Sequence, residues 1–292
     1  MIVRPDRLLP DRLLNDGRLS VYRHPVAVRV AHWLNAGALL LLLLSGLQIF
    51  NAHPALYLGK ASRFEQPVLA MESRSGPGDR LIGVTRLLGR EWVTTGLFGA
   101  SRDGAEVVDR GFPSWATLPP GRDLATARIW HFFFAWVFAL NGAAYLAWGL
   151  ATGRVRRELL PTGAELKRIG TSIAEHARLR FPKGEAARRY NVLQKLSYLG
   201  VLFGLLPLMI VTGMCMSPGL DAAFPWLPAV FGGRQSARTV HFTVASLIVL
   251  FVLVHLAMVV AAGLVNEVRS MVTGRYVIDP RAEAEPTAER RP

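Results

Sequence analysis

The stretch Val240–Val265, VHFTVASLIVLFVLVHLAMVVAAGLV, contains no Asp, Glu, Lys or Arg. An α-helix rises about 1.5 Å per residue, so about 20 apolar residues are enough to cross the hydrocarbon core of a bilayer. Three other stretches share this length and this lack of charge: Val30–Ile49, Ile129–Leu150 and Leu196–Met216. One such helix could be buried in a large soluble domain, but four in one chain predict an integral membrane protein, an all-α bundle of four helices.

The composition of the 292 residues excludes several other classes of protein. Hydrophobic residues make up 51% and charged residues only 19%, which excludes a disordered chain. The single cysteine, Cys215, has no partner within the chain, which excludes a scaffold built on disulfides. The formal net charge is +13, yet the basic residues form no recognition motif for nucleic acid. We therefore attribute the basic excess to membrane topology and expect no nucleic-acid partner.

The basic residues are distributed unevenly between the apolar stretches. Residues 1–29 hold six basic residues against three Asp, residues 151–193 hold ten against four Glu, and the loop 217–239 holds only two. By the positive-inside rule, we expect both termini and the 151–193 loop in the cytoplasm and the protein in the bacterial inner membrane. The predicted segments are a cytoplasmic tail (1–25), a span (26–50), a periplasmic loop or cap (51–127), a span (128–150), a cytoplasmic basic loop (151–193), a span (194–216), a periplasmic loop (217–238), a span (239–265) and a cytoplasmic tail (266–292).

The long loop before the second span is rich in Gly and Pro and carries Trp92 and Trp115. Its stretch Leu81–Ala100 is partly apolar but is broken by charges such as Arg90, so an interfacial helix or a folded cap is expected rather than a fifth span. Long loops without structure are uncommon unless they are functional. Two interpretations stay open: a lid over the bundle, or a docking surface for a partner outside, with Trp92, Trp115 and Arg90 as its candidate residues.

Four of the seven histidines, His32, His131, His241 and His255, lie inside the apolar stretches, where an ionisable side chain is costly and usually functional. The other three, His24, His53 and His176, lie in tails or loops, where solvated or interfacial side chains are the default. His241 and His255 are fourteen residues apart, so they share one helix face, offset by about 40° and separated by about 21 Å along the axis. Each could therefore hold one axial position of a haem.

The alternating direction of the spans matches the histidines by depth. His32 and His255 fall on the cytoplasmic side, and His131 and His241 fall on the periplasmic side, so two pairs are predicted with no ligand missing. Hydrogen-bonded packing or a proton relay is the alternative for each membrane histidine. Zinc is disfavoured, since each level offers only two imidazoles and the spans supply no Asp or Glu. Small residues leave room for a flat macrocycle, among them Gly37, Gly142 and Ala245.

Four short motifs occur in a fixed order along the chain: Arg29-Val-Ala-His32-Trp33-Leu-Asn35, Trp130-His131, Tyr190-Asn191…Gln194-Lys195 and His241…His255. The set resembles the membrane di-haem cytochrome b subunits of nickel–iron hydrogenase, formate dehydrogenase (gamma subunit) and thiosulfate reductase. The resemblance covers roughly residues 22–50, 128–150 and 190–278. It implies a four-helix bundle with two haems b that passes electrons between a quinone, menaquinone or ubiquinone, and a catalytic subunit on the outer face.

The resemblance also implies a quinone near the cytoplasmic haem, beside an Asn at the position of Asn191. The long loop is closest to the thiosulfate-reductase type, which favours a molybdopterin oxidoreductase as partner over a hydrogenase. From the residues themselves, Tyr190, Asn191, Gln194 and Lys195 offer donors and acceptors for a quinone, with interfacial anchoring as the alternative. Candidates for pairing with haem propionates are Arg29, Arg128 and Arg238, with anchoring at the cytoplasmic surface as the alternative for Arg29.

Two axial imidazoles leave iron no open position, so we expect an electron-transfer subunit rather than a stand-alone catalyst. One alternative is a transporter of protons or ions that uses the histidines as a relay. It is disfavoured because such relays usually combine histidines with carboxylates, which the spans lack. The other alternative is a passive membrane anchor for an outer enzyme, which would not need four histidines matched by depth.

Overall fold

A computed structural model describes residues 11–178 and 190–280. The chain forms two compact units. The first, here called the terminal unit, comprises residues 1–33, 142–204 and 249–292, and the second, here called the cap unit, comprises residues 34–141 and 205–248. Each of the four long apolar helical segments contributes residues to both units.

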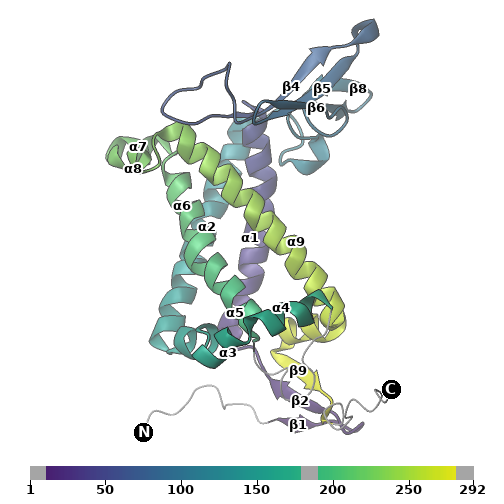
Figure 1. Ribbon diagram of the computed structural model, residues 1–292, viewed down its shortest axis with the longest axis vertical. Coiled ribbons are helices and arrows are strands. Elements are labelled where there is room, and N and C mark those ends of the chain that lie inside the picture. The colour runs from purple at the N-terminus through teal and green to yellow at the C-terminus, as the bar shows by residue number, and fades with distance from the viewer. Residues whose placement is uncertain (1–10, 179–189, 281–292) are drawn as a thin grey trace. The chain divides into compact units, whose positions relative to one another are not determined.

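The four predicted membrane segments lie in long helical segments, which can be followed by colour in Figure 1. Their bounds are Val26–Asn51 for α1, Leu124–Ala151 for α2, Val192–Met214 for the third segment and Arg234–Thr273 for α9. All four are long and apolar enough to cross a membrane. Large apolar side chains such as Phe133 and Trp136 of α2 are exposed, as expected for helices that contact lipid.

Two of these segments are interrupted. The third consists of α5 (Val192–Leu199), a wider π-helical turn η6 (Gly200–Leu205) and α6 (Leu206–Met214). Pro207 has no backbone N–H to donate to the carbonyl four residues earlier, and the wider turn accommodates this loss. In α9, the backbone leaves the helical conformation at Gly263, which has a φ of 116°.

The segment between α1 and α2 forms β-sheets, so the prediction of an all-α chain is wrong here. One antiparallel sheet has the strand order β3–β4–β5–β6, and β7 pairs with β8. The elements are β3 (Ala55–Leu56), β4 (Leu69–Ser75), the 3₁₀ turn η2 (Pro77–Asp79), β5 (Leu81–Leu87), β6 (Arg90–Val93), β7 (Ala100–Asp103), β8 (Glu106–Asp109) and the 3₁₀ turn η3 (Ser114–Ala116). The strands are short and separated by glycine turns, which leaves little periodicity in the sequence.

The stretch Leu81–Ala100 forms β5, β6 and the first residue of β7, so it is folded as expected, and the expectation of an interfacial helix is wrong. That this segment caps the bundle stays a prediction. Leu88 and Gly89 both have positive φ and join β5 to β6 as a two-residue turn, whose twist matches that of paired strands. Arg86 and Glu91 lie opposite each other across the two strands, 2.9 Å apart. The charges that exclude a membrane helix therefore stabilise the hairpin.

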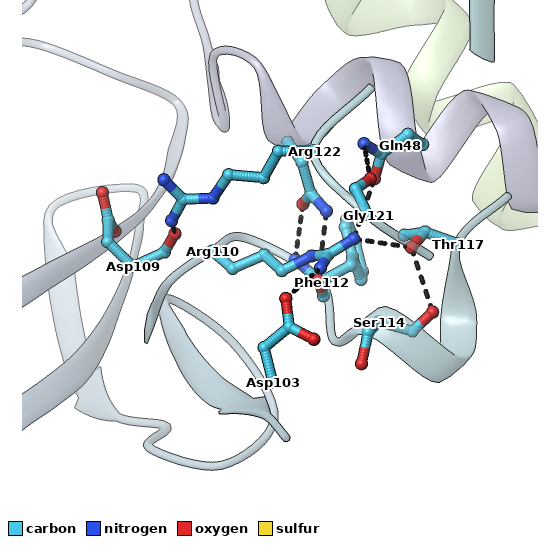
Figure 2. A network of polar contacts seen from close by, with 10 residues as sticks. Gln48, Asp103, Asp109, Arg110, Phe112, Ser114, Thr117, Gly121 and Arg122 are labelled. Carbon is cyan, nitrogen blue, oxygen red and sulfur yellow. Dashed lines mark hydrogen bonds and ion pairs between the residues drawn. The ribbon is translucent and has the colours of Figure 1, made fainter. Parts of the chain in front are cut away.

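A buried arginine fixes the cap to α1 (Figure 2). The side chain of Arg110 is 1% exposed, and its guanidinium donates to Gln48 Oε1 (2.9 Å) and to Thr117 Oγ1 (2.8 Å). Asp103 supplies a counter-charge at 3.4 Å, and Gln48 Nε2 donates to the carbonyl of Gly121. Gln48 belongs to α1, Asp103 to β7, and Thr117 to the loop that follows η3. The Arg110 side chain therefore joins three segments of the cap unit.

In the terminal unit, a three-stranded sheet brings the two ends of the described chain together. Strand β2 pairs with β1 on one side and with β9 on the other, both antiparallel. The bounds are Arg12–Leu13 for β1, Leu19–Tyr22 for β2 and Arg275–Ile278 for β9. The predicted tails 1–25 and 266–292 thus contain paired strands, while residues 1–10 and 281–292 lie outside the described part of the chain.

Short helices occupy the second and third predicted connecting loops. The 151–193 loop contains η4 (Val155–Leu159), α3 (Gly163–Lys167) and α4 (Ile169–Ala177), and residues 179–189 of this loop lie outside the described part. The loop before the fourth span contains α7 (Pro218–Ala223) and α8 (Trp226–Val230).

Candidate functional site

The cap unit brings together the rings of His131 on α2 and His241 on α9, with their centres 6.4 Å apart. A hydroxyl lies against the Nδ1 atom of each ring. Ser45 Oγ on α1 is 3.1 Å from Nδ1 of His131, and Thr212 Oγ1 on α6 is 3.0 Å from Nδ1 of His241. Four helices therefore contribute to this pair, two with imidazoles and two with hydroxyls.

A glycine follows each of these two hydroxyl residues and allows the close approach of the ring. A Cβ atom at Gly46 would lie 3.2 Å from Cε1 of His131, and one at Gly213 would lie 3.3 Å from Cε1 of His241. Both distances are tighter than nearly all real Cβ contacts. At Gly37 and Gly142, by contrast, no atom of the described residues lies within 4 Å of such a Cβ. The glycines that meet the rings are thus not the ones that the sequence singles out.

The terminal unit brings together the rings of His32 on α1 and His255 on α9, and their centres are also 6.4 Å apart. Aromatic side chains flank this pair: Trp33 meets His32 edge-on at 5.1 Å, and Phe251 stacks on His255 at 6.0 Å. The buried Nδ1 of His32 has no hydrogen-bond partner among residues 11–178 and 190–280. The two pairs thus have the same ring separation and different neighbours.

The three candidate propionate partners contact other groups of the protein. Arg29 donates to a backbone carbonyl of α9, and its buried Nε has no partner in the described chain. Arg238 lies 5.6 Å over the ring of Phe50 and donates to the backbone carbonyl of His53. Arg128 also lies over an aromatic ring. Arg29 and Arg238 therefore keep donor capacity or positive charge that a carboxylate could meet.

Three of the four quinone candidates have structural partners. Asn191 and Gln194 form a reciprocal capping box at the start of α5, in which each side chain accepts from the other residue's backbone N–H. Lys195 is buried, and its ammonium pairs with Glu165 at 2.7 Å. That contact lowers the pKa of the Glu165 carboxyl. Tyr190 instead packs among rings, with its hydroxyl 3.5 Å from Nδ1 of His24.

His24, one of the three histidines expected to be solvated or interfacial, is a buried polar residue. It is 5% exposed, and burial, together with the positive charge of Arg23, lowers the pKa of its imidazole to about 3. Burial also raises the pKa of the Tyr190 hydroxyl. Arg23 lies 4.6 Å over the ring of Tyr276 and 3.5 Å from the carboxylate of Glu267. These groups form a polar and aromatic cluster in the terminal unit, here called the Tyr190 cluster.

Comparisons with known proteins identify the family of the chain. The family model described as prokaryotic cytochrome b561 matches residues 23–274. The chain belongs to this family. It is 26% identical over 236 residues to the "Putative protein-methionine-sulfoxide reductase subunit YedZ1" of Azospira oryzae, over 81% of this chain and 89% of that relative. It is 34% identical over 91 residues to the "Putative cytochrome YdhU" of Escherichia coli, over 30% of this chain and 33% of that relative. No solved structure matches the chain.

Membership of the prokaryotic cytochrome b561 family establishes a membrane electron-transfer protein and implies haem b as its cofactor. With the four apolar helices, it makes the chain a multi-pass membrane protein. The resemblance to membrane cytochromes b that the histidine and arginine motifs carry is thus confirmed.

The geometry of both histidine pairs fits a haem with two axial imidazoles. Metal–imidazole bonds are about 2 Å long, and the centre of an imidazole ring lies roughly 1.15 Å from each nitrogen, given its bond lengths. Two imidazoles on opposite sides of one iron therefore have ring centres roughly 6.3 Å apart, close to the observed 6.4 Å. No cluster of three or more His, Cys, Asp or Glu occurs within the described ranges, so the residues suit haem better than zinc.

Several residues of these sites were not predicted from the sequence, and they differ in whether the sequence carries a local signal for them. The capping function of Asn191 and Gln194 follows the Asn-x-x-Gln pattern before an apolar run, which the sequence displays. Ser45 and Thr212 carry no such local signal, because each meets a histidine on another helix. Arg110 and His24 are recognised only by their burial.

Proposed function

We propose that this member of the cytochrome b561 family is a di-haem b cytochrome that passes electrons between a quinone and an oxidoreductase subunit on the outer side of the membrane. The observation that carries the proposal is the equal 6.4 Å ring separation of two independent histidine pairs, one in each unit. His32 and His255 would hold one haem, and His131 and His241 the other. Each haem would supply one-electron oxidation and reduction, with no open iron position for a substrate.

The Tyr190 cluster is the proposed place of the quinone, and the positive-inside rule puts it on the cytoplasmic side. It combines aromatic rings, which suit a flat ring, with the imidazole of His24 and the hydroxyl of Tyr190, which can exchange hydrogen bonds with carbonyl groups. Glu267, which pairs with Arg23 at the same cluster, offers a carboxylate that could accept a proton at its edge. Asn191, Gln194 and Lys195 stay candidates beside it, and their side chains also hold the start of α5 and its neighbour α3.

The hairpin of β5 and β6 is the proposed docking surface for the outer subunit. Leu88 and Val93 are 76% and 74% exposed, and Trp92 and Arg90 of β6 are exposed beside them. Exposed aromatic and arginine side chains are enriched where proteins bind one another. Trp115, also exposed, lies on η3 of the same unit.

The relative from Azospira oryzae is named as a subunit of a protein-methionine-sulfoxide reductase, which supports an oxidoreductase as the partner. We favour a molybdopterin oxidoreductase as the partner over a hydrogenase, because the long 51–127 loop resembles that of the thiosulfate-reductase type of subunit. Co-purification with the products of neighbouring genes distinguishes them.

Absorption spectroscopy of the purified protein and four single variants tests the proposal. The reduced wild type should show a b-type α-band and two haems per chain. His32→Ala and His255→Ala should each lose the same haem, and His131→Ala and His241→Ala the other. Quinol should still reduce the terminal-unit haem of His131→Ala. A colourless protein would support a histidine relay or a passive anchor, and full haem content in all four variants would refute the assignment.

A further inference from the structure

We propose that Ser45 and Thr212 are the positioning residues of the cap-unit haem, acting through the histidines that they contact. Each hydroxyl would accept a hydrogen bond from Nδ1–H of its histidine and so direct Nε2 toward the iron. The inference rests on the proposed function, since it requires His131 and His241 to be iron ligands.

The direction of each hydrogen bond follows from counting hydrogens. The Ser45 hydroxyl has one hydrogen and lies 2.6 Å from the carbonyl oxygen of Leu41, which can only accept. Thr212 repeats the arrangement with the carbonyl of Leu208, at 2.7 Å. Both hydroxyl residues are 0% exposed, so solvent does not compete for these contacts. Each hydroxyl therefore donates its only hydrogen to a carbonyl of its own helix, and it can only accept a hydrogen bond from the imidazole.

A neutral imidazole that donates from Nδ1 carries its lone pair on Nε2. This is the tautomer that binds a metal through Nε2, and the partner of the other nitrogen fixes both the tautomer and the ring orientation. The glycine that follows each hydroxyl residue lets the ring approach the hydroxyl, because Gly46 and Gly213 clear the space beside Cε1 of the ring. Two histidines are thus contacted in the same way, each by a hydroxyl residue followed by a glycine: Ser45-Gly46 on α1 and Thr212-Gly213 on α6.

An acceptor at Nδ1 makes the imidazole a stronger electron donor, which favours ferric over ferrous iron and lowers the reduction potential. In the terminal unit, by contrast, Nδ1 of His32 has no hydrogen-bond acceptor within the described chain. Ser45 and Thr212 should therefore lower the potential of one haem and leave the other unaffected.

The test is a redox titration of the two haems, followed optically and by EPR, in full-length Ser45→Ala, Thr212→Val and the double variant. In each single variant, one of the two titration steps should shift upward by a threefold to tenfold change in the ferric-to-ferrous equilibrium, where tenfold corresponds to about 59 mV for one electron. The low-spin ferric EPR signal of that same haem should shift, and the double variant should shift further. Thr243→Val is the matched control, since the Thr243 hydroxyl bonds the carbonyl of Thr239 on α9 and meets no histidine in the described ranges.

Variants that keep the hydroxyl protect the test against loss of fold. Ser45→Thr and Thr212→Ser should retain the wild-type potential and EPR signal. If Ser45→Ala loses one haem while Ser45→Thr keeps it, the hydroxyl has been shown to hold the site. Unchanged potentials, equal shifts of both haems, a shift in Thr243→Val, or loss of haem in the hydroxyl-keeping variants would each overturn the inference. Absence of haem from the wild type would instead refute the proposed function.

Discussion

The histidine pair of the cap unit and that of the terminal unit have the same ring separation but different surroundings. In the cap unit, a buried hydroxyl lies within 3.1 Å of Nδ1 of each ring, and a glycine follows each hydroxyl residue. In the terminal unit, aromatic side chains flank the rings and the Tyr190 cluster belongs to the same unit. The residues around the imidazoles, rather than the imidazoles themselves, therefore distinguish the two sites, and such neighbours set metal affinity and potential.

The first way to break this comparison is to fill the space beside a cap-unit ring. Leucine at Gly46 or Gly213 should displace His131 or His241, because even a Cβ there would lie only 3.2 or 3.3 Å from Cε1 of the ring. We expect Gly46→Leu and Gly213→Leu to lose one of two haems, measured as haem per chain. Gly204→Leu on the third helical segment is the control, since Gly204 is exposed. Loss of both haems would mean that the two pairs depend on each other.

The second way is to weaken the attachment of the cap. Arg110→Met leaves the buried oxygens of Gln48 and Thr117 without their donor, which should cost about 2 kcal/mol of unfolding free energy. The cap unit should become sensitive to protease at a lower denaturant concentration, while the terminal-unit haem spectrum stays unchanged. Arg122→Met is the control, since Arg122 is an exposed member of the same network (Figure 2) and should cost less than about 0.5 kcal/mol. Equal effects of both variants would contradict the role given to Arg110.

The third way uses pH to perturb the Tyr190 cluster of the terminal unit through His24. His24 has a pKa of about 3 in the folded protein, because of burial and the charge of Arg23, and an ordinary value of 6.5 when unfolded. Below pH 6.5 the unfolded chain binds a proton that the folded chain does not, so stability falls as the pH falls toward 3. The slope due to this group approaches about 1.4 kcal/mol per pH unit.

Unfolding curves between pH 7 and pH 4.5 measure this slope. His24→Gln should flatten the curve, whereas Tyr190→Phe should keep the slope, because it leaves a neutral imidazole buried. An unchanged slope in His24→Gln would assign the acid sensitivity to other groups.

The smallest effect is expected at the hairpin, which should matter for the partner and for neither haem. Leu88→Asp combined with Trp92→Ala should weaken binding of the outer subunit by about fivefold or more, roughly 1 kcal/mol. Binding is measured by titration of the purified subunit, with the haem spectrum as the check on folding. Leu13→Asp is the control, since Leu13 is equally exposed but lies in the terminal unit. Equal weakening in the control would show a general effect of surface charge.

The sequence predicts the four helical segments because hydropathy over about 20 residues is a local property. It fails in the cap, where strands as short as the two residues of β3 pair across turns and leave no long period to detect. Charges at Arg86 and Glu91 correctly exclude a membrane helix, but their partnership across two strands is visible only in the folded hairpin.

The sequence by itself determined which histidines lie in apolar helices and, through spacing and charge asymmetry, which of them should meet. The rings of His32 and His255, and of His131 and His241, do lie 6.4 Å apart. Only the tertiary structure decided which side chains contact the Nδ1 atoms of the rings. Ser45, for example, is separated from His131 by 86 positions in the chain. Helical periodicity fixes the face on which a residue lies, whereas the partner on that face depends on how separate helices pack, and no local pattern encodes that packing.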